Sequence, residues 1–287
     1  MVDLTTDAEV MATIRRALAE DIGSGDVTTL ALVDPDAVGT GEILAREACR
    51  VAGVCVGRAV LTCVDPSIEV NEVRADGDTV EAGGTILTLR GKAASILTAE
   101  RVTLNFMQRM CGIATLTSRF AEAVKPYGTM ILDTRKTTPG LRKFEKYAVL
   151  CGGGTNHRFG LFDRVLMKDN HRKLWLGGDP ERLDLAVEAA RKAYPELMVE
   201  VEVESVEECR SALRAKPEWI MLDNMDCERM RMCVALCKGI SKTEASGGIT
   251  LPRAAEVAAT GVDAISLGCL THSAPSIDLS LEWRVEA

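Results

Sequence analysis

The sequence of 287 residues lacks several features that would each define a class of protein. No stretch reaches the ~18 consecutive apolar residues of a membrane-spanning helix, so we expect no membrane contact. Residues 1–10 are acidic and lack the charged and then apolar pattern of a secretory signal. An excess of basic residues is also missing, because the formal net charge is −8; we therefore expect no nucleic-acid partner. These absences predict a cytoplasmic protein.

A C-x-x-C pair is missing as well, although the sequence has ten cysteines. Irregular cysteine spacing argues against a zinc-binding or redox motif. The closest pair, Cys233 and Cys237, lies one helical turn apart in an apolar run. We interpret the cysteines as reduced thiols of the core. A metal-binding or ligand-binding module built on cysteines is the alternative, and zinc analysis would test it.

A change of pattern near residue 98 predicts two domains. Residues 1–98 combine an opening amphipathic helix over 7–20 with short extended runs at 41–45, 51–56, 68–73 and 86–90. A long amphipathic helix then runs to about Val124, with Thr98 as its expected N-cap.

Short apolar runs alternate with helical stretches in the second part of the chain. The runs cover 130–132, 165–167, 198–203, 219–222, 242–245 and 264–267, and the helical stretches cover 180–194, 205–215, 226–238 and 252–260. This alternation predicts parallel strands with helical crossovers. Each run ends at polar or glycine residues, and barrel active sites lie at the carboxyl ends of the strands. We therefore predict an incomplete α/β barrel with about six or seven parallel strands.

The window from Ile131 to Arg172 reverses the charge of the whole chain. It holds nine Lys and Arg against four Asp and Glu, whereas the chain holds 34 against 42. These charges interrupt apolar strands and a glycine run at 152–154, so we favour a concave anion site over a solvated basic surface. The planar guanidinium groups of Arg135 and Arg158 would suit a dicarboxylate.

Acidic residues also occur in or directly after the next predicted strands. Glu200, Glu202 and Glu204 alternate along one predicted strand, and Asp223 follows another. An edge strand with a charged outer face would explain Glu204. The surrounding residues look buried, so at least one glutamate is expected to point into the barrel mouth, where carboxylates could hold ribose hydroxyls or Mg²⁺.

Glycines follow the last two predicted strands. Ser246, Gly247 and Gly248 precede a helix with Pro252 in its first turn, and Gly268 follows the final run. Backbone N–H groups at such a helix start can bind phosphate, and the late strands of barrels frequently build a phosphate site in this way.

On these residues the sequence resembles the quinolinate phosphoribosyltransferase family. The resemblance runs in order over nearly the whole chain and rests on Gly268 and on residues 20–28, 100–105, 133–142, 146–149, 152–154, 156–158, 168–171, 200–202, 222–225, 246–248 and 271–273. It implies an N-terminal α/β sandwich domain over 1–98, completed by a tail over 272–287. An incomplete α/β barrel over 99–271 would carry the active site.

The resemblance also implies the reaction and the assembly. Quinolinate and phosphoribosyl pyrophosphate would give nicotinate mononucleotide, pyrophosphate and CO₂ in NAD biosynthesis, with Mg²⁺ as cofactor. The chain would form a homodimer or a higher oligomer, in which Arg101 reaches into the partner's site.

The resemblance implies roles for the residues of each matching motif. The quinolinate carboxylates would meet Arg135, Lys136, His157, Arg158 and Arg101 of the partner subunit. Lys168 would lie between the pyridine and pyrophosphate, and Glu202 and Asp223 would serve the ribose and the metal. Lys136, Lys168, Glu202 and Asp223 would be the catalytic residues. The remaining substrate contacts would be Thr134, Ser246, Gly247, Gly248, Leu267, Gly268 and Cys269, with phosphate held by residues 246–248 and 267–269.

The chemistry agrees with this set of residues. Departure of pyrophosphate leaves positive charge on the ribose, which carboxylates stabilise, while Mg²⁺ and cations stabilise the leaving group. The ribosylated pyridinium then accepts electrons from the departing carboxylate, so no Ser-His-Asp arrangement is expected. The alternatives are a related pyrophosphorylase-like paralogue associated with molybdate uptake, which would act on a different acceptor, and a barrel isomerase, which would also fit the predicted sheet. Assays of nicotinate and quinolinate side by side would separate the two pyrophosphorylase hypotheses.

Overall fold

The computed structural model describes residues 3–175 and 179–284, which belong to two compact units. Unit 1 comprises Met1–Ser118, Thr137–Gly153 and Cys269–Ala287, and unit 2 comprises Arg119–Lys136 and Gly154–Gly268. This division differs from the predicted boundary near residue 98. The cause is the long helix α4 (Ala93–Val124), whose Ile96, Leu104 and Met107 share one buried cluster with the N-terminal sheet. Helix α4 also begins before Thr98, whose hydroxyl lies 3.5 Å from an Asp26 carboxylate oxygen.

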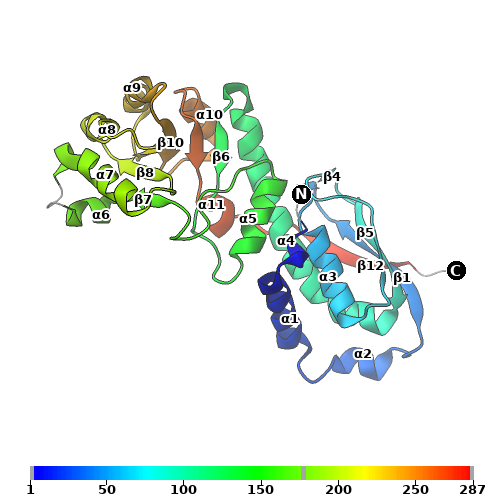
Figure 1. Ribbon diagram of the computed structural model, residues 1–287. Helices are drawn as coiled ribbons and strands as arrows, with labels where there is room; N and C mark the ends of the chain where they lie inside the picture. Colours follow the sequence, from blue (N-terminus) through cyan, green and yellow to red (C-terminus); the bar gives the residue numbers. More distant parts are fainter. Residues whose placement is uncertain (1–2, 176–178, 285–287) are drawn as a thin grey trace. The chain divides into compact units, whose positions relative to one another are not determined.

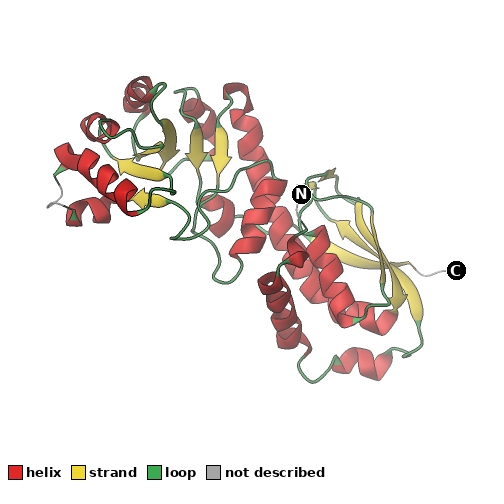
Figure 2. Ribbon diagram, viewed as in Figure 1, coloured by secondary structure: helices red, strands yellow, loops and turns green. Residues whose placement is uncertain are grey.

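Unit 1 is built on an antiparallel sheet of four strands (Figure 2). Its order is β12-β1-β5-β3, with β1 (Val38–Ala45), β3 (Glu69–Glu72), β5 (Thr85–Lys92) and β12 (Leu279–Arg284). Strand β12 pairs with β1 from Thr40↔Arg284 to Ala45↔Leu279. The last described strand therefore completes a sheet that begins near the N-terminus, and residues 285–287 of the predicted tail lie outside the described residues.

The predicted strand over 51–56 is wrong. Strand β2 (Cys49–Arg50) pairs with β4 (Thr79–Val80), and helix α3 (Val54–Val64) begins after Gly53, whose φ is +90°. Val54, Val60 and Leu61 are buried in this helix. A short apolar run fits a buried strand and a buried helix equally well, because periodicity alone does not separate them.

The other helices of unit 1 start at capping residues or follow turns. Asp7 caps α1 and accepts hydrogen bonds from the backbone N–H groups of Glu9 and Val10, which fixes the start of the predicted opening helix. The remaining helical segments of the unit are η1 (Leu4–Thr6), α1 (Ala8–Ile22), α2 (Val27–Leu32), α5 (Arg142–Cys151) and α11 (Cys269–His272).

Unit 2 contains the predicted parallel sheet (Figure 1). Its strands are β6 (Met130–Leu132), β7 (Val165–Met167), β8 (Val199–Val203), β9 (Trp219–Asp223), β10 (Lys242–Ser246) and β11 (Ala264–Ser266). All neighbours in the order β6-β11-β10-β9-β8-β7 are parallel. Strands β6 and β7 end this order, and Leu132 of β6 forms one further isolated parallel bridge with Thr155. Within the described ranges β6 and β7 do not pair with each other, so the sheet is an incomplete barrel and not a closed one.

Helices alternate with these strands, as the sequence predicts. They are η2 (Lys125–Tyr127), α6 (Asp169–Leu174), η4 (Pro180–Arg182), α7 (Leu183–Ala193), α8 (Val206–Leu213), α9 (Cys227–Cys237) and α10 (Leu251–Ala258). Ser205 caps α8 and Asp226 caps α9 through side-chain acceptors. Throughout the described ranges, all helices are too short or too polar to cross a bilayer. All ten cysteines are free thiols, and seven of them are buried.

Candidate active site

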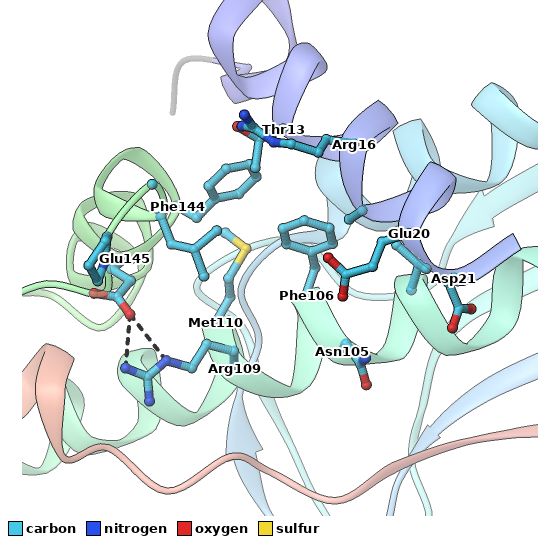
Figure 3. Close-up of a pocket in the computed structure, with 15 residues that line it drawn as sticks. Thr13, Arg16, Glu20, Asp21, Asn105, Phe106, Arg109, Met110, Phe144 and Glu145 are labelled. Atoms are coloured by element: carbon cyan, nitrogen blue, oxygen red, sulfur yellow. Dashed lines mark hydrogen bonds and ion pairs between the residues drawn. The ribbon is translucent and has the colours of Figure 1, made fainter. Parts of the chain in front are cut away.

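One cavity lies in unit 1 and does not match the predicted anion site. It measures about 590 Å³ and is lined by α1, α4 and residues 139–145 (Figure 3). The Phe106 and Phe144 rings stack there with their centroids 5.0 Å apart. Arg109 is paired with the buried Glu145, with Nη2 2.8 Å from Oε1, as the dashed lines in Figure 3 show. The guanidinium of Arg109 is therefore already engaged.

A second cavity, of about 380 Å³, lies in unit 2 and gathers four of the predicted cations. They are Arg135, Lys136, Arg158 and Lys168. The complete lining is Thr134, Arg135, Lys136, His157, Arg158, Leu161, Leu166, Lys168, His171, Met221, Glu244, Ser246 and Ser266. This cavity lies where the charge reversal between Ile131 and Arg172 predicts a concave anion site.

The curvature of the sheet brings these residues together. Thr134 to Lys136 follow β6 and Lys168 follows β7, and these are the two edge strands of the sheet. Ser246 ends β10, near the middle of the strand order. Residues that follow both edges line one cavity, so the sheet curls around it, and the site lies at the carboxyl ends of the strands.

Like charges face each other in the cavity. Arg158 is 9% exposed, and its Nη1 donates to the carbonyl oxygen of Arg164 at 3.2 Å. Burial, and then the positive charge of Arg135, lower the pKa of Arg158. An arginine nevertheless stays protonated in proteins. The two guanidinium groups therefore repel each other, and a bound dianion would relieve this repulsion.

Glu202 lies beside Lys168 and belongs to a cluster of three carboxylates. Nζ of Lys168 is 3.6 Å from Oε2 of Glu202, and the backbone N–H of Asp169 donates to Oε1 of Glu202 at 3.2 Å. Burial raises the pKa of Glu202. One oxygen each from Glu202, Glu204 and Asp223 lie within 4.8 Å of one another. Hard carboxylate oxygens at this spacing fit Mg²⁺. Glu204 is the member that the sequence assigned to a charged outer face.

The glycines after β10 adopt the conformation that a close backbone approach needs. Gly247 and Gly248 have φ values of +96° and +59°, which favour glycine. A Cβ at Gly247 would overlap the side-chain oxygen of Asn224, whose backbone N–H donates to the carbonyl oxygen of Ser246 at 3.0 Å. Helix α10 then starts with Pro252 in its first turn, as predicted, and its N-cap residue makes no side-chain cap.

The remaining predicted residues occupy three different places. Leu267 is buried after β11 and donates its backbone N–H to the carbonyl oxygen of Leu132 at 2.9 Å, and Gly268 follows it. Cys269 is the first residue of α11 in unit 1. Arg101 lies on α4 in unit 1, with 57% of its side chain exposed and Glu100 at 3.9 Å. These residues are not among those lining the unit 2 cavity.

His157 is tied to carboxylates inside unit 2. Its Nε2 lies 3.1 Å from Oε2 of Glu200 and 3.4 Å from Oε2 of Glu244. Sequence reasoning assigned no role to Glu244, because a single glutamate in a short strand gives no sign of its burial.

Comparisons with known proteins give one consistent family. The model of the quinolinate phosphoribosyl transferase N-terminal domain matches residues 26–111, and that of the C-terminal domain matches residues 113–282. A chloroplastic nicotinate-nucleotide pyrophosphorylase (carboxylating) of Arabidopsis thaliana is 43% identical, over 97% of this chain and 84% of the relative. A probable nicotinate-nucleotide pyrophosphorylase (carboxylating) of Bacillus subtilis is 40% identical, over 92% and 89%. The solved nicotinate-nucleotide pyrophosphorylase of Francisella tularensis superposes with a TM-score of 0.90 at 39% identity, covering 96% of each chain.

Proposed function

Since the chain belongs to the quinolinate phosphoribosyltransferase family, we propose that it transfers the phosphoribosyl group of phosphoribosyl pyrophosphate to quinolinate. The transfer is coupled to decarboxylation and yields nicotinate mononucleotide, pyrophosphate and CO₂, a step of NAD biosynthesis. The relatives named above bear the names of this activity.

The observation that carries the proposal is the set of four cations around one cavity. Quinolinate has two adjacent carboxylates, and two planar guanidinium groups can each bind a carboxylate with two parallel hydrogen bonds. Arg135 and Arg158 are the residues for this recognition. Lys136 and Lys168 add charge, so that a dianion and a polyphosphate can occupy neighbouring positions without strong repulsion.

The carboxylates serve the other substrate. As the bond to pyrophosphate breaks, the ribose carbon gains positive charge, and Glu202 and Asp223 stabilise that charge electrostatically. Glu202, Asp223 and Glu204 are also the residues that would hold Mg²⁺, and their donor set fits this ion. A bound Mg²⁺ would neutralise charge on the leaving pyrophosphate. Lys168, which lies 3.6 Å from Glu202, bridges this group and the pyridine side.

Loss of CO₂ requires no nucleophile from the protein. Ribosylation leaves the pyridine nitrogen positively charged. As CO₂ departs, C2 keeps the electron pair of the broken bond, stabilised by the adjacent nitrogen, and then takes up a proton from water. The protein's task is to orient the ring, which the two arginines do through the carboxylates.

The phosphate of the ribose would be held by residues 246–248, with Leu267, Gly268 and Cys269 as its further partners. Gly247 supports this role because a Cβ there would overlap Asn224, and Gly248 supports it because its positive φ favours glycine. The active assembly is a homodimer in which Arg101 of the partner subunit completes the quinolinate site. The exposure of the Arg101 side chain supports this part of the proposal.

The test is release of ¹⁴CO₂ from carboxyl-labelled quinolinate. We expect release only when quinolinate, phosphoribosyl pyrophosphate and Mg²⁺ are all present, with nicotinate mononucleotide formed in equal amount. Unlabelled nicotinate serves as the competing acceptor in a parallel assay. Turnover of nicotinate without turnover of quinolinate would show that the acceptor is wrong.

A further inference from the structure

Three buried polar side chains meet at the floor of the unit 2 cavity. His157, Glu200 and Glu244 are 8%, 0% and 0% exposed, and His157 and Glu244 line the cavity. One ligand atom from each lies within 4.8 Å of the others. The catalytic roles proposed above use neither of the two glutamates.

The sheet explains why the glutamates meet. In parallel strands, residues in register point to the same face. Glu200 on β8 is in register with Trp219 on β9, and Glu244 on β10 is in register with Met221. Trp219 and Met221 are two residues apart in β9, so both glutamates lie on one face. Ala264, in register with Glu244, packs with Trp219 on this face in an apolar cluster, so the glutamates lie beside apolar side chains.

The ring of His157 is held at both nitrogens. The backbone N–H of Arg158 donates to Nδ1 at 2.7 Å, while Nε2 faces Glu200 and Glu244. Burial lowers the pKa of His157, but the contacts with the two carboxylates raise it above its ordinary value. The carboxylates favour the protonated ring and the backbone donor favours the neutral one, and both arrangements keep a proton on Nε2. Arg164, with Nη1 3.1 Å from Oε2 of Glu200, anchors that carboxylate.

Burial of Glu244 is unfavourable for the stability of the fold. Both of its oxygens are buried, and Oε2 lies 3.4 Å from Nε2 of His157, which is longer than an ordinary hydrogen bond. Burial, and then the charge of Glu200, raise the pKa of Glu244, whereas the contacts with His157 and Ser266 lower it. A buried acid with so little compensation reduces stability. Its position against a cavity-lining histidine therefore points to a role in the site.

We infer that Glu244 is a positioning residue of the active site: together with Glu200 it holds the His157 ring through Nε2, and the ring fixes the backbone of Arg158. Arg158 then presents its guanidinium to the cavity in one orientation. This inference rests on the proposed function only for the identity of the acid that Arg158 binds.

The first test needs no substrate. The chain has three histidines, His157, His171 and His272, so a ¹⁵N–¹H spectrum of histidine-labelled protein separates their ring signals. We expect a His157 proton on Nε2, shifted downfield by its carboxylate partners, and a smaller shift in Glu244→Ala, in which Glu200 remains 3.1 Å from Nε2. Glu228→Gln, which changes an exposed acid on α9, should leave the signal in place. An unchanged His157 signal in Glu244→Ala would overturn the inference.

The second test is kinetic. Glu244→Ala should raise the KM for quinolinate about tenfold, equivalent to about 1.4 kcal/mol, and should leave the KM for phosphoribosyl pyrophosphate nearly unchanged. Glu244→Gln should restore the KM for quinolinate, because the amide oxygen still accepts from Nε2. Equal defects in Gln and Ala, or equal changes for both substrates, contradict a positioning role.

The tests distinguish a failure to fold from a loss of function. If Glu244→Ala does not fold, Glu244→Met replaces it, because methionine fills a similar volume and offers no strong acceptor; its melting temperature should equal or exceed that of the wild type. If the wild-type protein does not turn over quinolinate, the proposed function fails. The ring spectrum still decides whether Glu244 holds His157.

Discussion

Arg135 and Arg158 reach one cavity from two separate segments, one after β6 and one after the glycines at 152–154. They cannot neutralise each other, and the positive charge of Arg135 lowers the pKa of Arg158. Arg158 is buried and Arg135 is partly exposed. Under the proposed function, these two positive charges favour an acid with two negative groups over an acid with one.

Arg135→Ala and Arg158→Ala should each weaken quinolinate binding by about 1.5–3 kcal/mol, the value of one charge-assisted contact. That loss corresponds to an increase in Kd of between about tenfold and more than a hundredfold, and binding of phosphoribosyl pyrophosphate should change far less. Titration calorimetry with each substrate measures both numbers. Arg253→Ala, which removes an exposed charge from α10, is the matched control. Equal weakening of both substrates would show that the arginines are misassigned.

Four residues of the candidate site were predictable because one pattern in the sequence marks all of them. A local reversal of charge marks Arg135, Lys136, Arg158 and Lys168, and all four line the cavity. Glu244 has no such signal, because its burial depends on β9 and β11 on either side of β10. Contacts that depend on the order of strands in a sheet cannot be predicted from the sequence around one residue.

At the scale of elements, one glycine allows the C-terminal segment to pass close to α4. Gly112 lies in the interior of this helix of 32 residues, where the segment around Pro275 crosses it. A Cβ at position 112 would overlap the carbonyl oxygen of Pro275. The backbone of the C-terminal segment cannot rotate away as a flexible side chain can.

We expect Gly112→Ala to lower the free energy of unfolding by about 1–3 kcal/mol, as overpacking does. Helix propensity alone would give the opposite sign, a gain of about 1 kcal/mol, so urea unfolding distinguishes the two effects. Gly57→Ala in α3 is the control: its new Cβ would meet the flexible end of Met107, with the sulfur at 2.6 Å, and should cost less. A stabilised Gly112→Ala protein would refute the close approach.

Most elements of unit 2 were predictable from the sequence, and some in unit 1 were not. The six parallel strands follow from apolar runs that alternate with helices of ordinary length. The misassigned run at 51–56 is short and apolar throughout, and its helical form depends on burial against α4, where Met107 and Met110 approach Gly57 and Gly53. Tertiary packing decides such segments, and local sequence does not.

At the scale of the whole molecule, the site residues are divided between the units. The cations of the cavity belong to unit 2, whereas Arg101 belongs to unit 1 and is more than half exposed. A single exposed arginine on a helix is ordinarily a solvated residue. The proposed homodimer gives it a different role, in the site of the partner subunit.

Complementation between inactive variants tests this role. Arg101→Ala and Lys168→Ala proteins should each be inactive, and mixing them under subunit exchange should restore activity, up to about one quarter of the wild-type value for random pairing. In a shared site, a mixed dimer has one site with both defects and one site with neither. If each site is built from one chain, every site keeps one defect. Absence of recovery, with exchange demonstrated by mass spectrometry, would refute the shared site.

The pairing of β12 with β1 also has a consequence for synthesis on the ribosome. Residues 279–284 are translated after every residue of unit 2, yet they cover an edge of the sheet that begins at Val38. Throughout translation of unit 2, β1 has an unpaired edge, and such an edge can pair with other chains. The nascent protein is therefore exposed to aggregation through this edge while unit 2 and its cavity are being synthesised.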